Sequence, residues 1–490
     1  MAKIYLNEDS SHYFFTRREK ASDMAEIMDF IQQYKGTNVE RFILNANAQR
    51  TSFRSRVWES IEDHMDMAGP YLRESPGIKD WMSAVKDLAD RNIDVYALWI
   101  DALRGISISP WISMRMNDVH NANDIQNPLH SSFYRNHLEY RRAMYRDQGW
   151  EDRQLNYLVE EVRKHHMRLV EEYFQRYDFD GLELDWMRFG NHFPTGRCDE
   201  GRPVLDAFMK RIRELADKHG EAKGRRIGIG VRVPVDPSTA FDMGMDASLW
   251  AREGYVDYIA PSPFWETSQH DIPVEMWKKL VHGTGVKIAP CLEICLRQTR
   301  FPHCQNEHPF NRMETIRAAA FSYVDRGADA VYFFNYMDRL DDFYTVDEYR
   351  DILEETGSRE RMLVKPKRFI LTFNDRKPDG KPWDVRLPDS LKKDIFHEYR
   401  LHTGNLKGCH ARMHVVLSFS GVMPAQGPEV FLNGERCRPE GKVELSHPRP
   451  AHPCFRWSIP EEGFKNGYQV VEVVPHADDL VLEWVEISLE

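Results

Sequence analysis

Residues 177–188 read YDFDGLELDWMR, a stretch that predicts a short buried strand with acidic residues at its end. Side chains alternate across a strand, so Gly181, Glu183 and Asp185 share one face, and the two intervening leucines share the other. We expect the leucine face to pack on helices. The acidic face must line a polar cavity, because burying an unpaired carboxylate is costly.

Trp186 and Arg188 follow at the carboxyl end of this predicted strand. Two carboxylates, an indole and a guanidinium at one strand end are typical of a sugar site, and enzyme barrels carry their chemistry at the carboxyl ends of their strands. The alternative is an ion-paired core, in which Arg188 or Arg232 neutralises Glu183 and Asp185.

Strand and helix patterns alternate eight times over residues 1–360. The other predicted strands are 3–6, 41–44, 94–99, 226–233, 256–261, 286–292 and 329–334. This alternation predicts an α/β fold, specifically a (β/α)8 TIM barrel. Residues 102–150 are predicted to be a long excursion at the mouth of the barrel, since loops of that length are usually functional.

Residues 357–368 are charged and contain a proline, and a domain boundary is predicted there. Beyond it the hydrophobic period changes from 3.6 to 2, with Gly, Pro and Asn between short apolar runs. This pattern predicts an antiparallel β-sandwich over residues 361–490, after a barrel domain at 1–360. Its VFLNG and GYQVVEV segments resemble galactose-binding-like accessory domains of carbohydrate-active enzymes.

Composition excludes some classes of partner. Lys plus Arg is 66 and Asp plus Glu is 77, which gives a net charge of −11. Nucleic acids and anionic membranes need clustered positive charge, so neither is expected as a partner. The start of the chain shows no apolar signal core and no long apolar run occurs, so we expect a cytoplasmic protein, or a secreted or periplasmic one if a signal peptide has been removed.

The motif FDGLELDWMRF resembles the fourth-strand signature of glycoside-hydrolase-like TIM barrels. It is similar to the DGxxLD(Y/F)xR segment of the glycosyl-hydrolase-like family related to family 10 and DUF187, and this likeness implies a barrel hydrolase acting on a carbohydrate substrate. Family 18 chitinases have a related DGxxxDxE run. Met187 stands where their catalytic glutamate would be, which disfavours the chitinase mechanism.

Glycoside hydrolysis usually needs two carboxylates, one acid with a raised pKa and one ionised nucleophile or base. Asp185 is the first candidate for nucleophile or base. Glu266 and Glu293 are the candidate acids, with Glu266 slightly favoured because a nucleophile on the fourth strand often pairs with an acid from the fifth or sixth. The remaining candidate substrate-binding residues are Glu183, Arg188, Trp186, Arg232, Asp236, Trp265, Asn335, Tyr336, Asn45 and Asp101.

Three alternative functions remain open from the sequence: a non-catalytic glycan-binding barrel, a polysaccharide lyase, and a metal-dependent hydrolase on the same scaffold. No cofactor is expected. The cluster of Cys291, Cys295, His303, Cys304 and His308 fits no standard zinc spacing, so no metal site is predicted.

Overall fold

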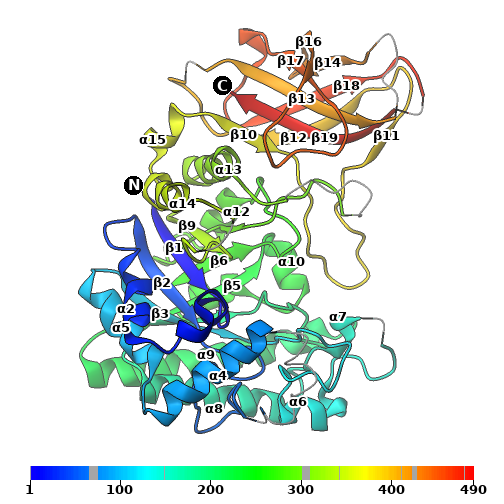
Figure 1. The fold of residues 1–490 in the computed structure, drawn as a ribbon. Helices are drawn as coiled ribbons and strands as arrows, with labels where there is room; N and C mark the ends of the chain where they lie inside the picture. Colours follow the sequence, from blue (N-terminus) through cyan, green and yellow to red (C-terminus); the bar gives the residue numbers. More distant parts are fainter. Residues whose placement is uncertain are drawn as a thin grey trace.

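The structure is a computed structural model that describes residues 2–63, 65, 76–147, 149–300, 309–340, 343–409, 411–421, 427–478 and 480–490. Its first part is built on one curled sheet of parallel strands (Figure 1). These strands are β1 (Lys3–Glu8), β2 (Val39–Asn45), β3 (Ser109–Arg115), β4 (Gly181–Asp185), β5 (Gly228–Pro234), β6 (Tyr258–Ser262), β7 (Lys287–Ile288), β8 (Cys291–Glu293) and β9 (Ala330–Phe334).

The sheet curls so far that its two ends meet. The hydrogen-bonded order is β7-β6-β5-β4-β3-β2-β1-β9-β8, yet β7 and β8 are separated by Ala289 and Pro290 alone. Ala289 still donates its amide to Ile259 on β6 at 3.0 Å, and Pro290 accepts from Tyr332 on β9 at 3.0 Å. The prediction of a mixed α/β fold with a barrel-like core is thus confirmed.

Helices cover the outer face of the curled sheet (Figure 1). The main ones are α1 (His12–Arg17), α2 (Met24–Gln32), α4 (Pro76–Asp90), α5 (Val95–Gly105), α8 (Glu160–Arg176), α9 (Cys198–Lys223), α10 (Pro237–Asp242), α11 (Ala247–Arg252), α12 (Val274–Leu280), α13 (Met313–Asp325), α14 (Val346–Glu355) and α15 (Arg359–Leu363). Among the described residues, no helix is both long enough and apolar enough to cross a lipid bilayer.

The predicted third strand, 94–99, is wrong. Residues 95–105 form α5, and the Asp94 side chain caps its first turn by accepting from the Ala97 amide at 3.3 Å. The strand beside β2 and β4 is instead β3, which lies inside the segment predicted as an excursion. Asp101 is therefore exposed on an outer helix, and its predicted place at a strand end is wrong as well.

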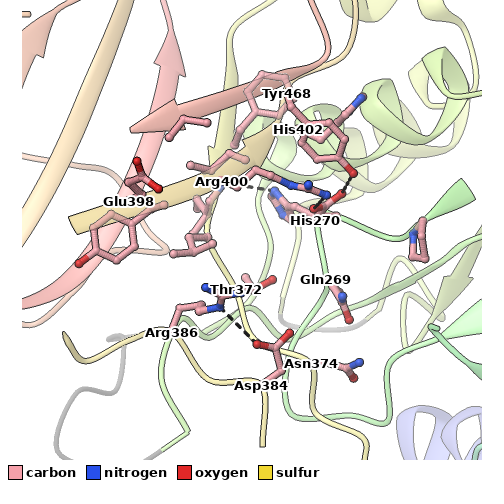
Figure 2. Close-up of a pocket in the computed structure, with 18 of the residues that line it drawn as sticks. Gln269, His270, Thr372, Asn374, Asp384, Arg386, Glu398, Arg400, His402 and Tyr468 are labelled. Atoms are coloured by element: carbon pink, nitrogen blue, oxygen red, sulfur yellow. Dashed lines mark hydrogen bonds and ion pairs between the residues drawn. The ribbon is translucent and has the colours of Figure 1, made fainter. Parts of the chain in front are cut away.

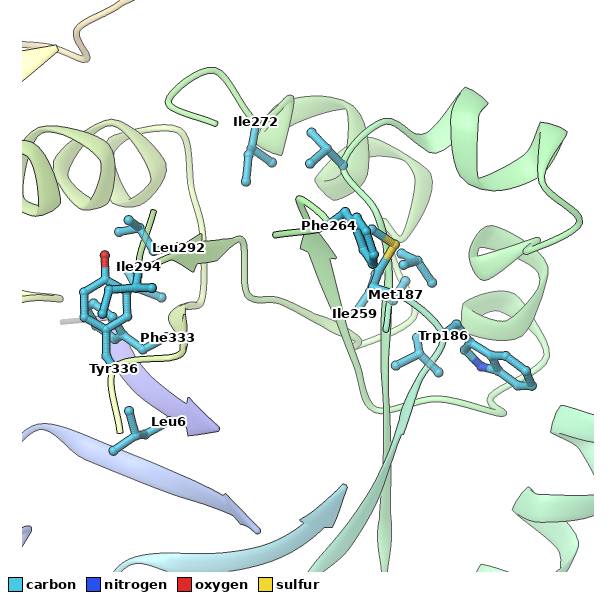
Figure 3. Close-up of a cluster of buried hydrophobic side chains, with 14 of the residues drawn as sticks. Leu6, Trp186, Met187, Ile259, Phe264, Ile272, Leu292, Ile294, Phe333 and Tyr336 are labelled. Carbon is cyan, nitrogen blue, oxygen red and sulfur yellow. The ribbon is translucent and has the colours of Figure 1, made fainter. Parts of the chain in front are cut away.

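The two faces of β4 behave as the alternation predicts. Leu182 and Leu184 join the core between sheet and helices, part of which Figure 3 shows. On the inner face, Gly181 leaves room for the Trp111 indole, because a Cβ there would lie 2.3 Å from the ring. Trp111 belongs to an apolar cluster of mostly aromatic and small side chains: Tyr5, Ile43, Trp111, Tyr258, Ala260, Ala289, Cys291, Ala330, Tyr332 and Phe334.

Gly181→Ala is expected to lower the free energy of unfolding by about 1–3 kcal/mol, because the added methyl group overpacks the barrel interior. Urea denaturation would measure this loss. Gly105→Ala is the matched control, since a Cβ at Gly105 meets nothing within 4 Å. Equal stability of the two variants would contradict the close approach of Trp111.

The chain continues into two antiparallel sheets (Figure 1). One contains β10 (Lys367–Ile370), β11 (Asp389–Leu391), β13 (Met413–Ser420), β16 (Arg438–Val443), β17 (Cys454–Ser458) and β19 (Leu480–Leu489). The other contains β12 (His397–His402), β14 (Glu429–Leu432), β15 (Glu435–Arg436) and β18 (Tyr468–Val474). The prediction of a β-rich C-terminal part is confirmed, while the exact domain boundary stays a prediction.

Residues 371–386, which we call the strap, connect β10 to β11 and run back beside the first part of the chain, reaching α10 (Figure 1). Lys381 on the strap pairs with Asp242 at the end of α10, at 2.7 Å. Arg142, from the segment after β3, pairs with Asp379. The C-terminal sequence thus contributes directly to the surroundings of the barrel-like core.

Candidate functional site

Polar side chains gather where the parallel strands end, at the edge that we call the mouth. Because the carboxyl ends of parallel strands meet at one edge, residues far apart in sequence come together there. The residues at or just after these strand ends include Asp9 (β1), Asn45 (β2), Arg115 (β3), Asp185 (β4), Asp236 (β5), Ser262 (β6), Glu293 (β8) and Asn335 (β9).

Asp185 lies at the centre of a buried ion pair. Its Oδ2 accepts from Arg232 Nη1 at 2.6 Å, and both side chains are almost fully buried. Its Oδ1 accepts from the amides of Met187 and Arg188 at 3.0 and 2.9 Å. The Arg232 guanidinium also lies over the Phe334 ring, 3.8 Å from its centre. The ion-paired alternative named Arg188 or Arg232 as the neutralising residue. In the structure, Arg232 is the one that pairs with Asp185.

Glu183 lies one layer deeper in the barrel-like core and is fully buried. Three hydroxyl groups donate to its carboxylate: Ser113 at 2.7 Å, Tyr258 at 2.6 Å and Tyr332 at 2.9 Å. Burial, reinforced by the negative charge of Asp185, raises the pKa of Glu183 to about 7. This carboxyl is enclosed by its partners, which suits a role in holding the interior together.

The raised pKa of Glu183 makes stability depend on pH. Between pH 4.5 and about 7 the folded state binds the proton more tightly than the unfolded state, so this carboxyl destabilises the fold progressively as pH rises through that window. Glu183→Gln is expected to reduce the loss of unfolding free energy between pH 5 and pH 8, measured by urea denaturation at both values. Glu221→Gln, an exposed change on α9, controls for the altered charge; identical pH profiles for all three chains would contradict the prediction.

Glu293 ends β8 and is almost fully buried. Its Oε1 accepts from Asn335 Nδ2 at 2.6 Å and from the Ile294 amide at 3.1 Å, whereas its Oε2 has no hydrogen-bond partner in the described part of the chain. Burial raises the pKa of Glu293 to about 7, against the opposing effects of Asn335 and Arg188. A carboxyl group with one unpaired oxygen and a pKa of about 7 is suited to donate a proton at neutral pH.

Glu266 lies in the loop after β6, and about a quarter of its side chain is exposed. Burial and the neighbouring Asp375 raise the pKa of Glu266. Arg300 lies 3.8 Å from its carboxylate. Glu266 is therefore less enclosed than Glu293, although the sequence slightly favoured it as the acid.

The strap fixes the loop that carries Glu266. The buried Asp375 carboxylate accepts from the amides of Phe264, Trp265 and Glu266 at 2.7, 2.9 and 2.9 Å. Next to it, Asn374 donates to Asp236 at 3.3 Å. Sequence reasoning missed Asp375, because it lies more than a hundred residues from the loop it binds.

Most of a second group of polar residues at the mouth was also missed, although Arg188 within it was predicted. Arg188 donates to Nε2 of His120 at 2.8 Å, so the Nδ1 proton of His120 is directed to Asp118, also at 2.8 Å. Arg115 pairs with Asp118 at 3.2 Å and with Asp9. Asp9, Arg115 and His120 line a cavity of about 410 Å³, which also contacts Phe15 and Trp81 of the outer helices.

Several predicted substrate-binding residues do not line an open site. Trp186 is fully buried and packs edge-on against Tyr157 and His192, so its prediction as a stacking surface is wrong. Tyr336 is also buried, and its hydroxyl donates to the Glu293 carbonyl at 3.2 Å. Asn45 is buried too, and donates to the Ser113 carbonyl at 3.2 Å.

Trp265 is about half exposed beside Phe264 and keeps a position from which it can contact a ligand. The described residues contain no group of three or more His, Cys, Asp or Glu arranged to hold a metal ion. His303, Cys304 and His308 of the cluster considered for zinc lie outside the described residues.

Comparison with known proteins gives distant similarities. No family model matches this chain, and no curated protein is similar to it in sequence. Among solved structures, the chain is similar to a cycloisomaltooligosaccharide glucanotransferase from Paenibacillus sp. (8% identity, TM-score 0.33, covering 99% of this chain and 57% of that chain). This chain thus spans just over half the length of that enzyme.

Two further solved structures are glycoside hydrolases. One is a family 18 N-acetylglucosaminidase from Paenibacillus barengoltzii (11% identity, TM-score 0.39, covering 72% of this chain and 99% of that chain). The other is α-L-fucosidase isoenzyme 1 from Paenibacillus thiaminolyticus (11% identity, TM-score 0.35, covering 97% of both chains). All three TM-scores are below 0.5.

Proposed function

We propose that this chain is a glycoside hydrolase that cleaves an O-glycosidic bond of an oligo- or polysaccharide at the mouth. The observation that carries the proposal is Glu293, a buried carboxyl with a pKa of about 7 whose Oε2 has no partner among the described residues. It lies at the same sheet edge as Asp185, which pairs with Arg232. A protonated and an ionised carboxyl are the pair that glycoside hydrolysis usually needs.

In the proposed mechanism, Glu293 protonates the oxygen of the leaving sugar. Asp185 stabilises the positive charge that develops on the sugar ring, either as nucleophile or as base toward water. Arg232 and the backbone amides of Met187 and Arg188 hold the Asp185 carboxylate in place by hydrogen bonds. Arg188 and the half-exposed Trp265 are proposed to contact the sugar.

The scaffold is part of the same proposal. We infer that β7 and β8 are two halves of one strand, since the two residues between them keep hydrogen bonds to both neighbours. Counted in this way, the sheet is an eight-stranded (β/α)8 barrel, and the two C-terminal sheets are a β-sandwich accessory domain. The relation to the family-10-related proteins and to DUF187 stays a prediction.

One observation favours a second candidate, a non-catalytic glycan-binding barrel. Both oxygens of Asp185 already accept hydrogen bonds, and the ion pair with Arg232 is buried. A carboxylate held in this way is restricted as a nucleophile, although each oxygen keeps lone-pair capacity.

A hydrolysis screen separates the two candidates. The wild-type chain and a Glu293→Gln variant are incubated with nitrophenyl glycosides and with neutral and acidic oligosaccharides, and new reducing ends are measured. Release by the wild-type chain and its loss in the variant would support hydrolysis. Binding of an oligosaccharide without release by either chain would support the glycan-binding alternative.

A further inference from the structure

A cavity beside the strap lies between the first part of the chain and the C-terminal sheets, and it shares Asp236 with the mouth. Its volume is about 600 Å³, within the range of ligand-binding pockets. Figure 2 shows Gln269 and His270 from the loop after β6, Thr372, Asn374, Asp384 and Arg386 from the strap, and Glu398, Arg400, His402 and Tyr468 from β12 and β18 on its walls.

The charges on these walls disfavour an anionic ligand. Four carboxylates line the cavity, from Asp236, Asp271, Asp384 and Glu398, and they outnumber the two guanidinium groups, from Arg386 and Arg400. The two lining histidines add no charge at neutral pH, since burial lowers the pKa of His270 to about 3 and that of His402 to about 4.

Two buried polar atoms on the wall have no partner in the described structure. His270 is 5% exposed, and its Nδ1 accepts from the Ile370 amide at 3.3 Å, so the proton is on Nε2, which has no acceptor. In the adjacent residue, Oε1 of Gln269 has no donor. Nε2 of His270 can donate to a ligand hydroxyl group, and Oε1 of Gln269 can accept from one.

Other groups on the cavity wall are also suited to contact a sugar. Arg386 and Asp384 lie 3.3 Å apart on the strap and are both largely exposed, which offers a second donor and acceptor pair. Met276 on α12 is about half exposed at the rim and provides an apolar surface for the C–H groups of a sugar ring.

We propose that this cavity is a second saccharide-binding site that holds a short neutral oligosaccharide between the barrel-like core and the C-terminal sheets. The site does not include Asp185 or Glu293, so it does not require that the chain be a hydrolase.

The test measures binding of four neutral probes, cellohexaose, xylohexaose, mannohexaose and maltohexaose, by isothermal titration calorimetry. The Glu293→Gln chain is used so that no probe is consumed. At least one probe is expected to bind, and a further Met276→Trp change, which fills the rim, is expected to weaken that binding at least tenfold. Leu280→Trp is the matched control, because Leu280 is exposed on the same helix and is not part of the cavity wall.

The outcomes separate this inference from the proposed hydrolysis. Equal affinity with and without Met276→Trp would assign the binding to the mouth and overturn the second site, as would the absence of binding for all four probes. A chain that hydrolyses nothing, yet loses binding through Met276→Trp, would overturn the proposed function and support the second site.

Discussion

Replacement of Glu293 by glutamine is expected to lower kcat/KM for an oligosaccharide by about 10²- to 10⁴-fold, the contribution typical of a general acid. The loss is expected to be much smaller for a dinitrophenyl glycoside, whose leaving group departs without protonation. The pKa of Glu293 is about 7, so kcat/KM of the wild-type chain should fall above pH 7 as the acid loses its proton. This alkaline decline should be absent in the variant.

Glu266→Gln is the matched control for this experiment, because Glu266 is the rival acid and is more exposed than Glu293. Its effect on kcat/KM is expected to be less than about tenfold, well below the general-acid contribution. A large loss on changing Glu266, with Glu293→Gln retaining activity and its alkaline decline, would transfer the role of acid to Glu266.

Replacement of Asp185 by asparagine is expected to lower the free energy of unfolding by about 3–5 kcal/mol, because Arg232 keeps a buried charge without its partner. The ion pair is almost fully buried, with N and O 2.6 Å apart, so solvent offers little compensation. Urea denaturation would measure the loss, and hydrolysis should be abolished under conditions in which the variant is still folded.

The double variant Asp185→Asn with Arg232→Met tests the cause. Asparagine keeps an oxygen for the amides of Met187 and Arg188, while methionine removes the buried charge. Most of the lost stability should return without any return of activity. If the single variant is as stable as the wild-type chain, another group, such as Glu183, compensates Arg232.

The acidic strand could be predicted from sequence because its pattern is local. The alternation of glycine or acid with leucine over residues 181–185 determines which face each side chain occupies, and the large apolar face then requires helices outside. The same reasoning located most of the other parallel strands to within two or three residues, because each is a short apolar run between loops.

The third strand could not be predicted in this way. The segment 95–99 combines β-branched and aromatic residues, which resembles a strand, but its buried residues continue as Ile100 and Leu103 at helical spacing. The true strand reads SPWISMR, and its proline and serines made it resemble a loop. This error removed Arg115 from the predicted site and put Asp101 into it.

The remaining site residues depend on contacts that no local pattern encodes. Asp9 and His120 join the site through long-range contacts. Arg115 pairs with Asp9, and Arg188 donates to His120. Trp186 was expected to face a sugar, but the chain turns after Asp185 and buries the indole against the helices. Burial of an aromatic ring in the core competes with its use as a stacking surface, and the sequence does not distinguish the two outcomes.

The contacts of the strap limit where this chain can be recombined without losing part of its site. A gene fragment that ends near residue 366 would encode every parallel strand of the first part, but not Asp375, which binds the loop after β6. A foreign C-terminal module joined at that point would have to supply an equivalent carboxylate at the same place. Recombination at this junction therefore separates residues that contribute to one site, so the two parts are expected to be inherited together and to diverge together.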